Sequence, residues 1–303
     1  MEHLLPVIRR IVKRGTHTVV DLSESANLYL TARQGEAYEA VVADQMYRES
    51  IAAPLAAGAE MLPHLLRSIA TGKKVNPVTI VDCGPATAEE SLRKLDSLRQ
   101  VVTVLRYVVV DVNPRLVSKV KTGVVHSSAV PVTILRRRFE ELDPSILRQH
   151  ITGGALLLFG STGMNYESAE LVHLLRKLCF SGMLVSLESL LRDDEVLTRG
   201  YESEAVIQFA FAPLSLLGAS REQFEFRPSL SEGRVSLEFV AKRRTQLRHP
   251  EAPVLQPGDR VRTAFSRRPT LYDHQQEVGR ILGSNFNTFV LRNRVAASLG
   301  CFL

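Results

Sequence analysis

The residues most able to do chemistry in this 303-residue chain stand at the ends of two apolar runs. Asp82 and Gly84 end the run that begins at Val78, and Asp111 ends the run LRYVVVDV at residues 105–112. A carboxylate after such a strand can accept hydrogen bonds from both ribose hydroxyls of an adenosine, and a glycine lets the backbone approach the ligand. The pattern predicts a site for an adenosine-containing cofactor, of which NAD and S-adenosylmethionine (SAM) are the common examples.

The number of glycines in the first loop distinguishes these two cofactors. A dinucleotide fingerprint needs G-x-G-x-x-G, which brings a pyrophosphate to a helix N-terminus. Here Gly84 is followed by Pro85 and Ala86. SAM carries no phosphate, and the acid-x-glycine sequence that begins at Asp82 satisfies its simpler motif. The loop therefore favours SAM over NAD, and an ordinary strand and turn that happens to end in an acid is the alternative.

An alternation of strands and helices must position these residues. Thr87 and Glu90 fit the capping box that begins a helix directly after the glycine loop. Alternating strands and helices predict a parallel α/β sheet, whose ligands bind at the carboxyl ends of the strands. Strands are expected at residues 78–83, 102–111, 130–135, 155–160 and 183–188, with a helix at 168–178. Asp82, Gly84, Asp111, Phe139, Ser161 and Glu188 then fall at the carboxyl edge.

The flanking segments follow other patterns. Residues 1 to about 70 are expected to be mostly helical, including an amphipathic surface helix at the start, and residues 190–212 are also helical in pattern. Alternating residues predict antiparallel strands at 223–226 and 235–242, before a proline-containing loop at 248–259. A helix at 272–282 and strand-like runs at 288–291 and 295–303 would complete a seven-stranded sheet.

These patterns predict an α/β protein with two domains. Residues 62–190 and 268–303 are expected to form a Rossmann-like SAM-binding domain. Residues 1–61 and 191–267 are expected to form a smaller α+β domain that binds the substrate and covers the site.

Composition limits the other classes of function. With 45% hydrophobic and 23% charged residues and a net charge of +6, the chain is an ordinary globular protein. Its basic residues are not interleaved with aromatic ones, so no nucleic-acid partner is expected. The three cysteines are widely spaced and predict neither disulfides nor a metal site. Neither a membrane span nor a signal peptide is indicated, and a cytoplasmic location is expected.

Several motifs together resemble the histidine Nα-methyltransferases of ergothioneine biosynthesis, the EgtD-type SAM-dependent enzymes. The glycine loop VDCGPAT and Asp111 in VVVDVNP are similar to that family's cofactor motifs. The most distinctive match is FGSTGMN at residues 159–165, which resembles the family's L-G-S-T-I-G-N. Three further matches are YEAVVAD at residues 38–44, the R-x-Y sequence at 199–201, and PGDRVRTAFS at 257–266. The resemblance extends from about residue 36 to the C-terminus.

The resemblance implies a class I SAM-dependent methyltransferase fold and assigns roles to particular residues. Asn165 and Tyr201 would be the catalytic pair and would bind the carboxylate of an amino-acid substrate. Tyr38 would close over its amine, and Ser266 would contact its side chain. Their neutral N–H and O–H donors suit a carboxylate in a desolvated pocket. The cofactor would be bound by Asp82, Gly84, Asp111, Val112, Arg138, Phe139, Gly160 and Ser161.

Three positions depart from the family pattern. Ala264 stands where the family has the glutamate that reads the imidazole ring, so histidine is not the expected acceptor. Arg138 replaces the acid that precedes the adenine-contacting Phe139, and Ala86 replaces a second loop glycine. The sequence therefore predicts methylation of the amine of another small amino acid, or of a metabolite derived from one, in specialised metabolism.

Two other functions and one weaker alternative remain open. A SAM-consuming cyclase or aminocarboxypropyl transferase, similar to azetidine-2-carboxylate synthases, would release methylthioadenosine. A non-catalytic SAM-binding protein would account for the three departures without any turnover. An RNA methyltransferase is least favoured, because no base-methylation motif of the N-P-P-Y type is present. The acceptor, the number of methyl groups transferred and the oligomeric state are not determined by the sequence.

Overall fold

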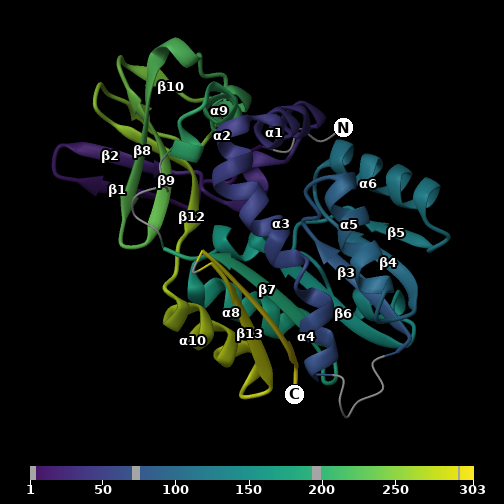
Figure 1. Ribbon diagram of the computed structural model, residues 1–303. Helices are drawn as coiled ribbons and strands as arrows, with labels where there is room; N and C mark the ends of the chain where they lie inside the picture. The colour runs from purple at the N-terminus through teal and green to yellow at the C-terminus, as the bar shows by residue number, and fades with distance from the viewer. Residues whose placement is uncertain (1–4, 70–75, 193–198, 293) are drawn as a thin grey trace. The chain divides into compact units, whose positions relative to one another are not determined.

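The computed structural model describes residues 5–69, 76–192, 199–292 and 294–303 (Figure 1). The chain divides into unit 1, Met1–Ser50 with Asp194–Arg267, and unit 2, Ile51–Asp193 with Arg268–Leu303. The sequence-based boundary at residue 62 therefore differs from the structure. Helix α3 (Ala53–Ala59) belongs to unit 2, because it packs against strands of that unit's sheet.

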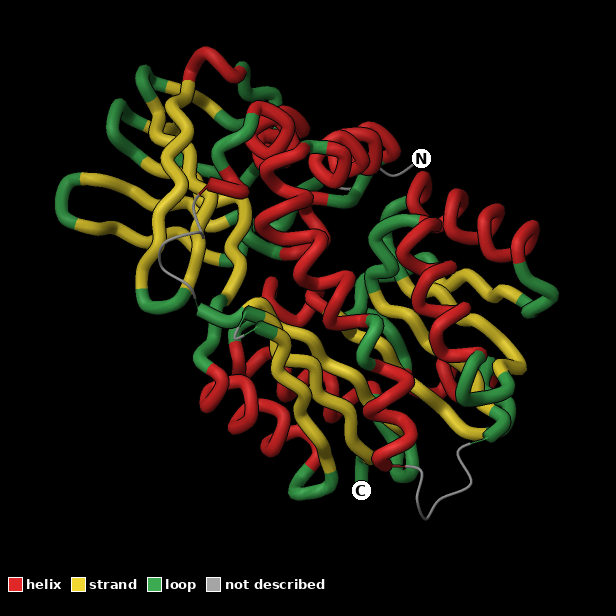
Figure 2. Tube along the Cα trace, viewed as in Figure 1, coloured by secondary structure: helices red, strands yellow, loops and turns green. Residues whose placement is uncertain are grey.

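Unit 2 contains a seven-stranded sheet in the order β13-β14-β7-β6-β3-β4-β5 (Figure 2). Strands β3 to β7 pair in parallel, and β14 pairs antiparallel with both β7 and β13. The strands are β3 (Val78–Cys83), β4 (Val104–Val110), β5 (Val132–Leu135), β6 (Gly154–Gly160), β7 (Leu184–Leu190), β13 (Phe286–Leu291) and β14 (Val295–Cys301). This topology confirms the predicted class I methyltransferase fold, including the terminal hairpin.

The order of the strands reverses beside β3. The chain first adds β4 and β5 on one side of β3, and then returns to add β6 and β7 on the other. In such sheets the loops after the two strands at the reversal separate and leave a ligand site at their carboxyl ends. This strand order therefore predicts a ligand site at the loops that follow β3 and β6.

Helices cover both faces of this sheet. One face packs against α4 (Leu62–Ile69), α5 (Ala88–Arg99) and α6 (Pro114–Ser127), and the other against α7 (Pro144–Gln149), α8 (Ser168–Leu178) and α10 (Leu271–Leu282). Alternate residues of β3 serve the two cores, with Ile80 in the first and Val81 in the second. Both are fully buried, which explains why the strand has no polar side.

Half of the capping box predicted at the start of α5 is present. The Thr87 hydroxyl accepts from the Glu90 backbone N–H at 3.2 Å and caps the helix. The Glu90 carboxylate lies instead 3.0 Å from the Lys94 ammonium. The reciprocal half of the capping box is thus replaced by an ion pair one turn into the helix.

Unit 1 is built on a five-stranded sheet in the order β1-β2-β12-β9-β8. Its strands are β1 (Arg10–Arg14), β2 (His17–Asp21), β8 (Phe224–Ser231), β9 (Arg234–Ala241) and β12 (Arg260–Arg267), with a separate pair β10 (Thr245–Gln246) and β11 (Val254–Leu255). Helices α1 (Ala32–Ala43), α2 (Gln45–Tyr47) and α9 (Glu204–Leu216) belong to this unit. Short helical turns at Ser25–Leu28, Arg48–Ala52, Ser161–Asn165, Arg199–Tyr201 and Arg221–Gln223 complete the description.

The predicted N-terminal helix is wrong, because β1 and β2 form an antiparallel hairpin there. Gly15 makes its turn with φ +60°, a conformation that suits glycine. Strand β2 then pairs in parallel with β12, and the Thr18 backbone N–H donates to Asp259 at 2.6 Å. The hairpin is stabilised by a strand far along the chain, which the local period cannot reveal. The helix expected at residues 190–212 begins only at Glu204, and residues 193–198 lie outside the described residues.

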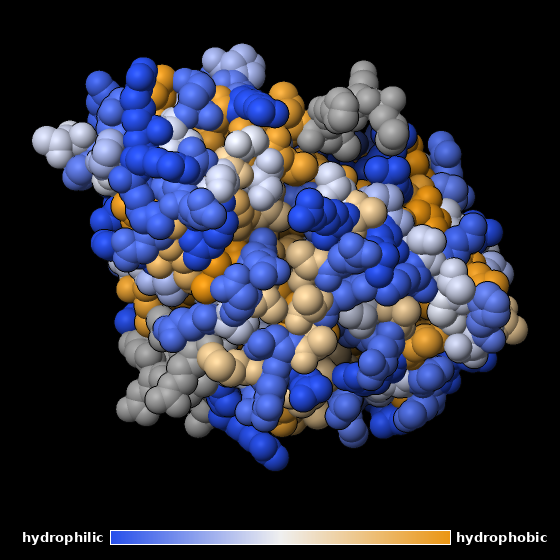
Figure 3. All heavy atoms as spheres, turned by 90° about the horizontal axis from the view of Figure 1, so that it is seen from above, coloured by the Kyte–Doolittle hydropathy of each residue, from blue (hydrophilic) through white to orange (hydrophobic). Residues whose placement is uncertain are grey.

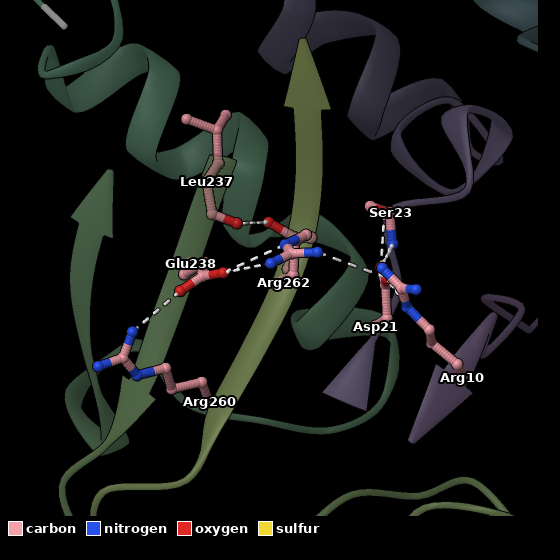
Figure 4. Close-up of polar contacts among 8 residues, drawn as sticks. Arg10, Asp21, Ser23, Leu237, Glu238, Arg260 and Arg262 are labelled. Carbon is pink, nitrogen blue, oxygen red and sulfur yellow. Dashed lines mark hydrogen bonds and ion pairs between the residues drawn. The ribbon is translucent and has the colours of Figure 1, made fainter. Parts of the chain in front are cut away.

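A row of charged side chains crosses the unit 1 sheet (Figure 4). Asp21 lies opposite Arg262 in the register, and Arg262 lies opposite Glu238. The Arg262 guanidinium donates to Glu238 at 2.9 Å and lies 3.7 Å from Asp21, which Arg10 also contacts at 3.0 Å. Although burial raises the pKa of Asp21, hydrogen bonds from Ser23 and the Arg262 charge leave it below its usual value. The pairs satisfy charges that are costly to bury alone.

Polar and charged side chains cover most of the face drawn in Figure 3, with smaller hydrophobic groups between them. In the described parts of the chain, no helix is both long enough and apolar enough to cross a membrane.

Candidate active site

The loops after β3 and β6 meet at the point where the strand order reverses. Gly84 has φ +72°, and a Cβ there would stand 2.5 Å from the Thr162 Oγ1. The Thr162 hydroxyl in turn donates to the Cys83 carbonyl at 3.4 Å. Gly160, directly before Ser161, has φ 48° and ψ −147°, a conformation that other residues avoid. The predicted Gly84, Gly160 and Ser161 thus lie at one edge of the sheet, and Thr162 is an addition that the sequence analysis missed.

Asp111 stands directly after β4, the strand that neighbours β3. Its Oδ1 accepts from the Asn113 backbone N–H at 2.7 Å, and the side chain of Asn113 caps α6. Burial raises the pKa of Asp111 to about 6, although hydrogen bonds from the backbone of Asn113 and Val112 oppose the shift. A buried carboxylate of this kind gains from hydroxyl donors, as the ribose prediction requires.

Phe139 follows β5 and lies beside the glycine turn. Its Cζ is 3.6 Å from the point that a Cβ on Gly84 would occupy, and its ring meets Phe159 edge-on at 5.5 Å. The neighbouring Arg138 is 13% exposed in its side chain and has its Nε 3.8 Å from Glu141. An aromatic face is thus available next to the turn, whereas Arg138 is drawn toward an acid of its own loop.

The acid-x-glycine motif predicted that Asp82 would bind the cofactor, but the Asp82 side chain is buried. The carboxylate is 1% exposed and accepts from the Tyr107 hydroxyl. The Lys94 ammonium lies 3.7 Å from its other oxygen. Burial raises the pKa of Asp82, and the charge of Lys94 and the Tyr107 hydrogen bond oppose that rise. Asp82 therefore forms part of a buried network below the glycine turn, and the structure does not place it as a direct cofactor contact.

Glu188, near the carboxyl end of β7, belongs to the same electrostatic network. Burial raises the pKa of Glu188 to about 7, Lys94 opposes the rise, and Glu90 and Asp82 add to it. The same three carboxylates outweigh the effect of burial on Lys94 and raise the pKa of its ammonium. We refer to Asp82, Glu90, Lys94, Tyr107 and Glu188 as the Lys94 cluster.

The sequence held one unused signal for the Lys94 cluster. Lys94 lies on the same helical face as Ser91, Leu95 and Leu98, all of which are buried. A lysine within an otherwise buried stripe needs a buried acid as its partner. Asp82, at the end of the preceding strand, was the nearest candidate along the chain.

Asn165 lies in the helical turn after β6 and is partly buried. Asn165 does not cap the next helix, because α8 has Glu167 at its N-cap, and the Glu167 backbone N–H donates to Glu170 at 3.1 Å. The Sδ of the preceding Met164 accepts from the Leu190 backbone N–H at 3.1 Å. The turn that carries Asn165 is thus fixed to the end of β7.

The other three predicted substrate residues belong to unit 1. The ring of Tyr38 on α1 packs against the rings of Tyr29 and Phe209, with 5.5 Å between the ring centroids in each pair. Tyr201 is 8% exposed and lies edge-on to Tyr47, with the ring centroids 6.4 Å apart. Both tyrosines are thus packed by other rings of their unit. Their contact with a substrate stays a prediction.

Ser266 and Ala264 occupy a face of the unit 1 sheet that the sequence spacing alone does not give. A bulge in β12 between Arg262 and Ala264 shifts the register, so Ala264 lies opposite Leu237 and Ser266 opposite Val235. Alternation without the bulge would put all three β12 residues on one face. The structure instead separates the charged Arg262 from the small Ala264 and Ser266.

Ala86 provides a stability test of the glycine loop. Its φ is 61°, in the left-handed region that disfavours a Cβ. We expect Ala86→Gly to relieve this strain and to raise the free energy of unfolding by up to about 1 kcal/mol. Urea unfolding measures the change, with Ala88→Gly in the first turn of α5 as the control that should lower stability. A loss of stability in Ala86→Gly would contradict the strained conformation.

Comparisons with known proteins add little to this topology. No protein-family model and no curated protein matches the chain. Among solved structures, it is similar to an O-methyltransferase family 2 protein from Planctomyces limnophilus in complex with apigenin, at 9% identity and a TM-score of 0.42, over 81% of this chain and 55% of that one. It is also similar to a mitomycin 7-O-methyltransferase, at 9% identity and a TM-score of 0.41, over 81% of this chain and 53% of that one.

A third similar structure has a length closer to that of this protein. It is the 1,6-didemethyltoxoflavin-N1-methyltransferase of Burkholderia thailandensis with its ligand and S-adenosylhomocysteine, at 8% identity and a TM-score of 0.44, over 85% of this chain and 81% of that one. The chain thus spans little more than half the length of the first two proteins. Similarity at this level is too weak to carry a function over.

Proposed function

We propose that this protein is a SAM-dependent methyltransferase that acts on the amine of a small amino acid or amino-acid-derived metabolite other than histidine. One observation carries the proposal. The Gly84 turn, closed by Thr162, and the carboxylate of Asp111 stand at the carboxyl edge where the order of a seven-stranded sheet reverses. That combination suits an adenosine with free ribose hydroxyls and no pyrophosphate.

The residues of unit 2 fit SAM as the cofactor. Asp111 would accept from the ribose hydroxyls, Phe139 would lie against the adenine ring, and the backbone at Gly84 and Gly160 would approach the rest of the molecule. When bound, SAM supplies a methyl group on a sulfonium. The chain supplies orientation and exclusion of water, and positioning of this kind accounts for ~7–11 kcal/mol of barrier lowering in favourable systems.

The choice of acceptor rests on unit 1 and on Asn165. Ala264 is 8% exposed and lies opposite Leu237, so this part of β12 offers methyl groups where an imidazole would need a hydrogen-bond acceptor. Asn165 and Tyr201 are proposed to bind the acceptor's carboxylate. Tyr38 is proposed to lie over its amine, and Ser266 to contact its side chain. These residue types favour a zwitterion with a small or apolar side chain.

Two measurements test the proposal. Calorimetric titration with SAM and with S-adenosylhomocysteine (SAH) should show binding of both. Incubation with SAM and a panel of amino acids, followed by mass spectrometry, should yield SAH and a product heavier by a methyl group. Methylthioadenosine would instead indicate transfer or cyclisation of the aminobutyryl chain, and binding without turnover a non-catalytic protein. Failure to bind either ligand would refute the proposal.

We expect SAH affinity to increase with pH through about 6. Only the ionised carboxylate accepts from both ribose hydroxyls, and burial raises the pKa of Asp111 to about 6 in the ligand-free protein. Below that pH a proton must leave before the ligand binds, which weakens binding by up to about tenfold per pH unit. Titrations at pH 5, 6, 7 and 8 should show this rise and then a plateau. A pH-independent dissociation constant would contradict the assignment.

A further inference from the structure

Amine methylation has one requirement that the proposed cofactor and acceptor contacts do not meet. An amino group near neutral pH arrives as an ammonium, which has no lone pair to attack a methyl carbon. A nearby base must accept its proton before or during the attack. Such a base must stand at the carboxyl edge of the sheet, where the cofactor and acceptor would lie.

Glu188 stands near that edge. It lies near the end of β7, and the register places Leu187, directly before it, opposite Gly160 at the end of β6. The turn that carries Asn165 is fixed to the same end of β7, since the Met164 Sδ accepts from the Leu190 backbone N–H. Glu188 therefore shares an edge with the cofactor loop and with the proposed acceptor contact.

The charges around Glu188 come from a few elements. Helix α5 contributes Lys94 and Glu90, β3 contributes Asp82, and β4 contributes Tyr107, which is hydrogen-bonded to Asp82. On the neighbouring strand β14 the residue opposite Glu188 is Ala297, and α3, which also packs on β7, has the sequence APLAAGA without an ionisable side chain. His274 of α10 contacts the adjacent Ser189, which points to the other face of the strand.

We propose that the carboxylate of Glu188 accepts the proton of the attacking amine, an inference that rests on the function proposed above. The ammonium N–H bond breaks and its proton moves to a Glu188 oxygen. The nitrogen lone pair then forms the N–CH3 bond while the S–CH3 bond breaks, and its electron pair stays on sulfur as the thioether of SAH. The pKa of Glu188, raised to about 7 by burial, leaves about half of the carboxyls ionised at neutral pH, which suits a base that must both accept and release a proton. Lys94 is the positioning residue, and its ammonium is the cation that faces the carboxylates of the cluster.

Sinefungin tests this without knowledge of the acceptor. It is a SAM analogue that carries an ammonium where SAM carries the transferable methyl group, so a carboxylate facing the acceptor position should bind it more tightly than SAH. We expect wild-type protein at pH 8 to prefer sinefungin by about ten- to hundredfold, the range of a charge-assisted hydrogen bond. Glu188→Gln should lose this preference while its SAH affinity stays within about twofold.

Glu90→Gln is the matched control, because it removes a carboxylate of the same cluster from the more exposed α5. It should retain the preference for sinefungin. If both variants lost the preference for sinefungin equally, the preference would come from the combined charge of the cluster. If Glu188→Gln kept the preference, Glu188 would not contact the sinefungin ammonium. Either result overturns the inference.

The pH dependence of the wild type decides the question if Glu188→Gln does not fold. The ratio of SAH to sinefungin dissociation constants should rise through pH 7, because Glu188 ionises there and would attract the sinefungin ammonium. Asp111 affects the binding of both ligands alike, so its effect cancels in the ratio. A flat ratio overturns the inference while leaving SAM binding intact. A wild-type protein that binds neither ligand refutes the proposed function itself, and the inference with it.

Discussion

Asp111→Asn is expected to weaken SAH binding by about a hundredfold at pH 8. The substitution keeps the shape of the side chain but removes the charge that would accept from two ribose hydroxyls, and each charge-assisted hydrogen bond contributes about 1.5–3 kcal/mol. The variant should also lose the pH dependence predicted for the wild type. Isothermal titration calorimetry with SAH at pH 6 and pH 8 measures both effects.

Asp96→Asn is the control for the loss of one negative charge, because Asp96 is exposed on α5. It should bind SAH within about twofold of the wild type, since surface charges are screened by solvent and salt. If Asp111→Asn bound SAH as tightly as Asp96→Asn, the adenosine site would have to lie elsewhere.

Lys94→Met is expected to lower the free energy of unfolding by about 3–5 kcal/mol at pH 8. The ammonium has a side chain only 6% exposed and lies 3.7 Å from Asp82, which is itself buried. Methionine fills a similar volume but leaves the carboxylates of Asp82 and Glu188 without their cation. Urea unfolding followed by circular dichroism gives the difference.

The pH dependence of that loss follows from the shifted carboxyls. Burial raises the folded-state pKa of Asp82 and raises that of Glu188 to about 7. Ionisation of these two carboxyls therefore lowers the free energy of unfolding. This cost is absent below their unfolded-state pKa values and grows as pH rises through their folded-state pKa values. Lys94→Met should therefore destabilise less at pH 5 than at pH 8.

Arg93→Met is the matched control on the same helix. Its ion pair with Glu89 is solvent-exposed, so the change should cost less than about 0.5 kcal/mol. An equally small loss in Lys94→Met would show that the Lys94 cluster does not stabilise the sheet edge.

The sequence by itself determined most of unit 2. Residues 78–83 and 168–178 were predicted with the bounds that β3 and α8 have in the structure, and the terminal hairpin was expected to close the sheet. Gly84 and Asp111 were predicted to bind the cofactor because a doubly wound sheet brings the ends of neighbouring parallel strands together. These features are local patterns of burial and turn geometry, and they are readable because each strand or helix shows its own period.

Tertiary structure decided the rest through contacts between distant segments. Strand β2 exists because β12 pairs with it, and the bulge in β12 decides which face Ser266 occupies. The inward turn of Asp82 depends on Lys94 and Tyr107, which approach it from a helix and a neighbouring strand. A carboxylate at the end of a strand looks the same in sequence whether it meets a ligand or a buried ammonium. Only the packing of other elements around it determines which partner it has, because the cost of burying a charge depends on what surrounds it.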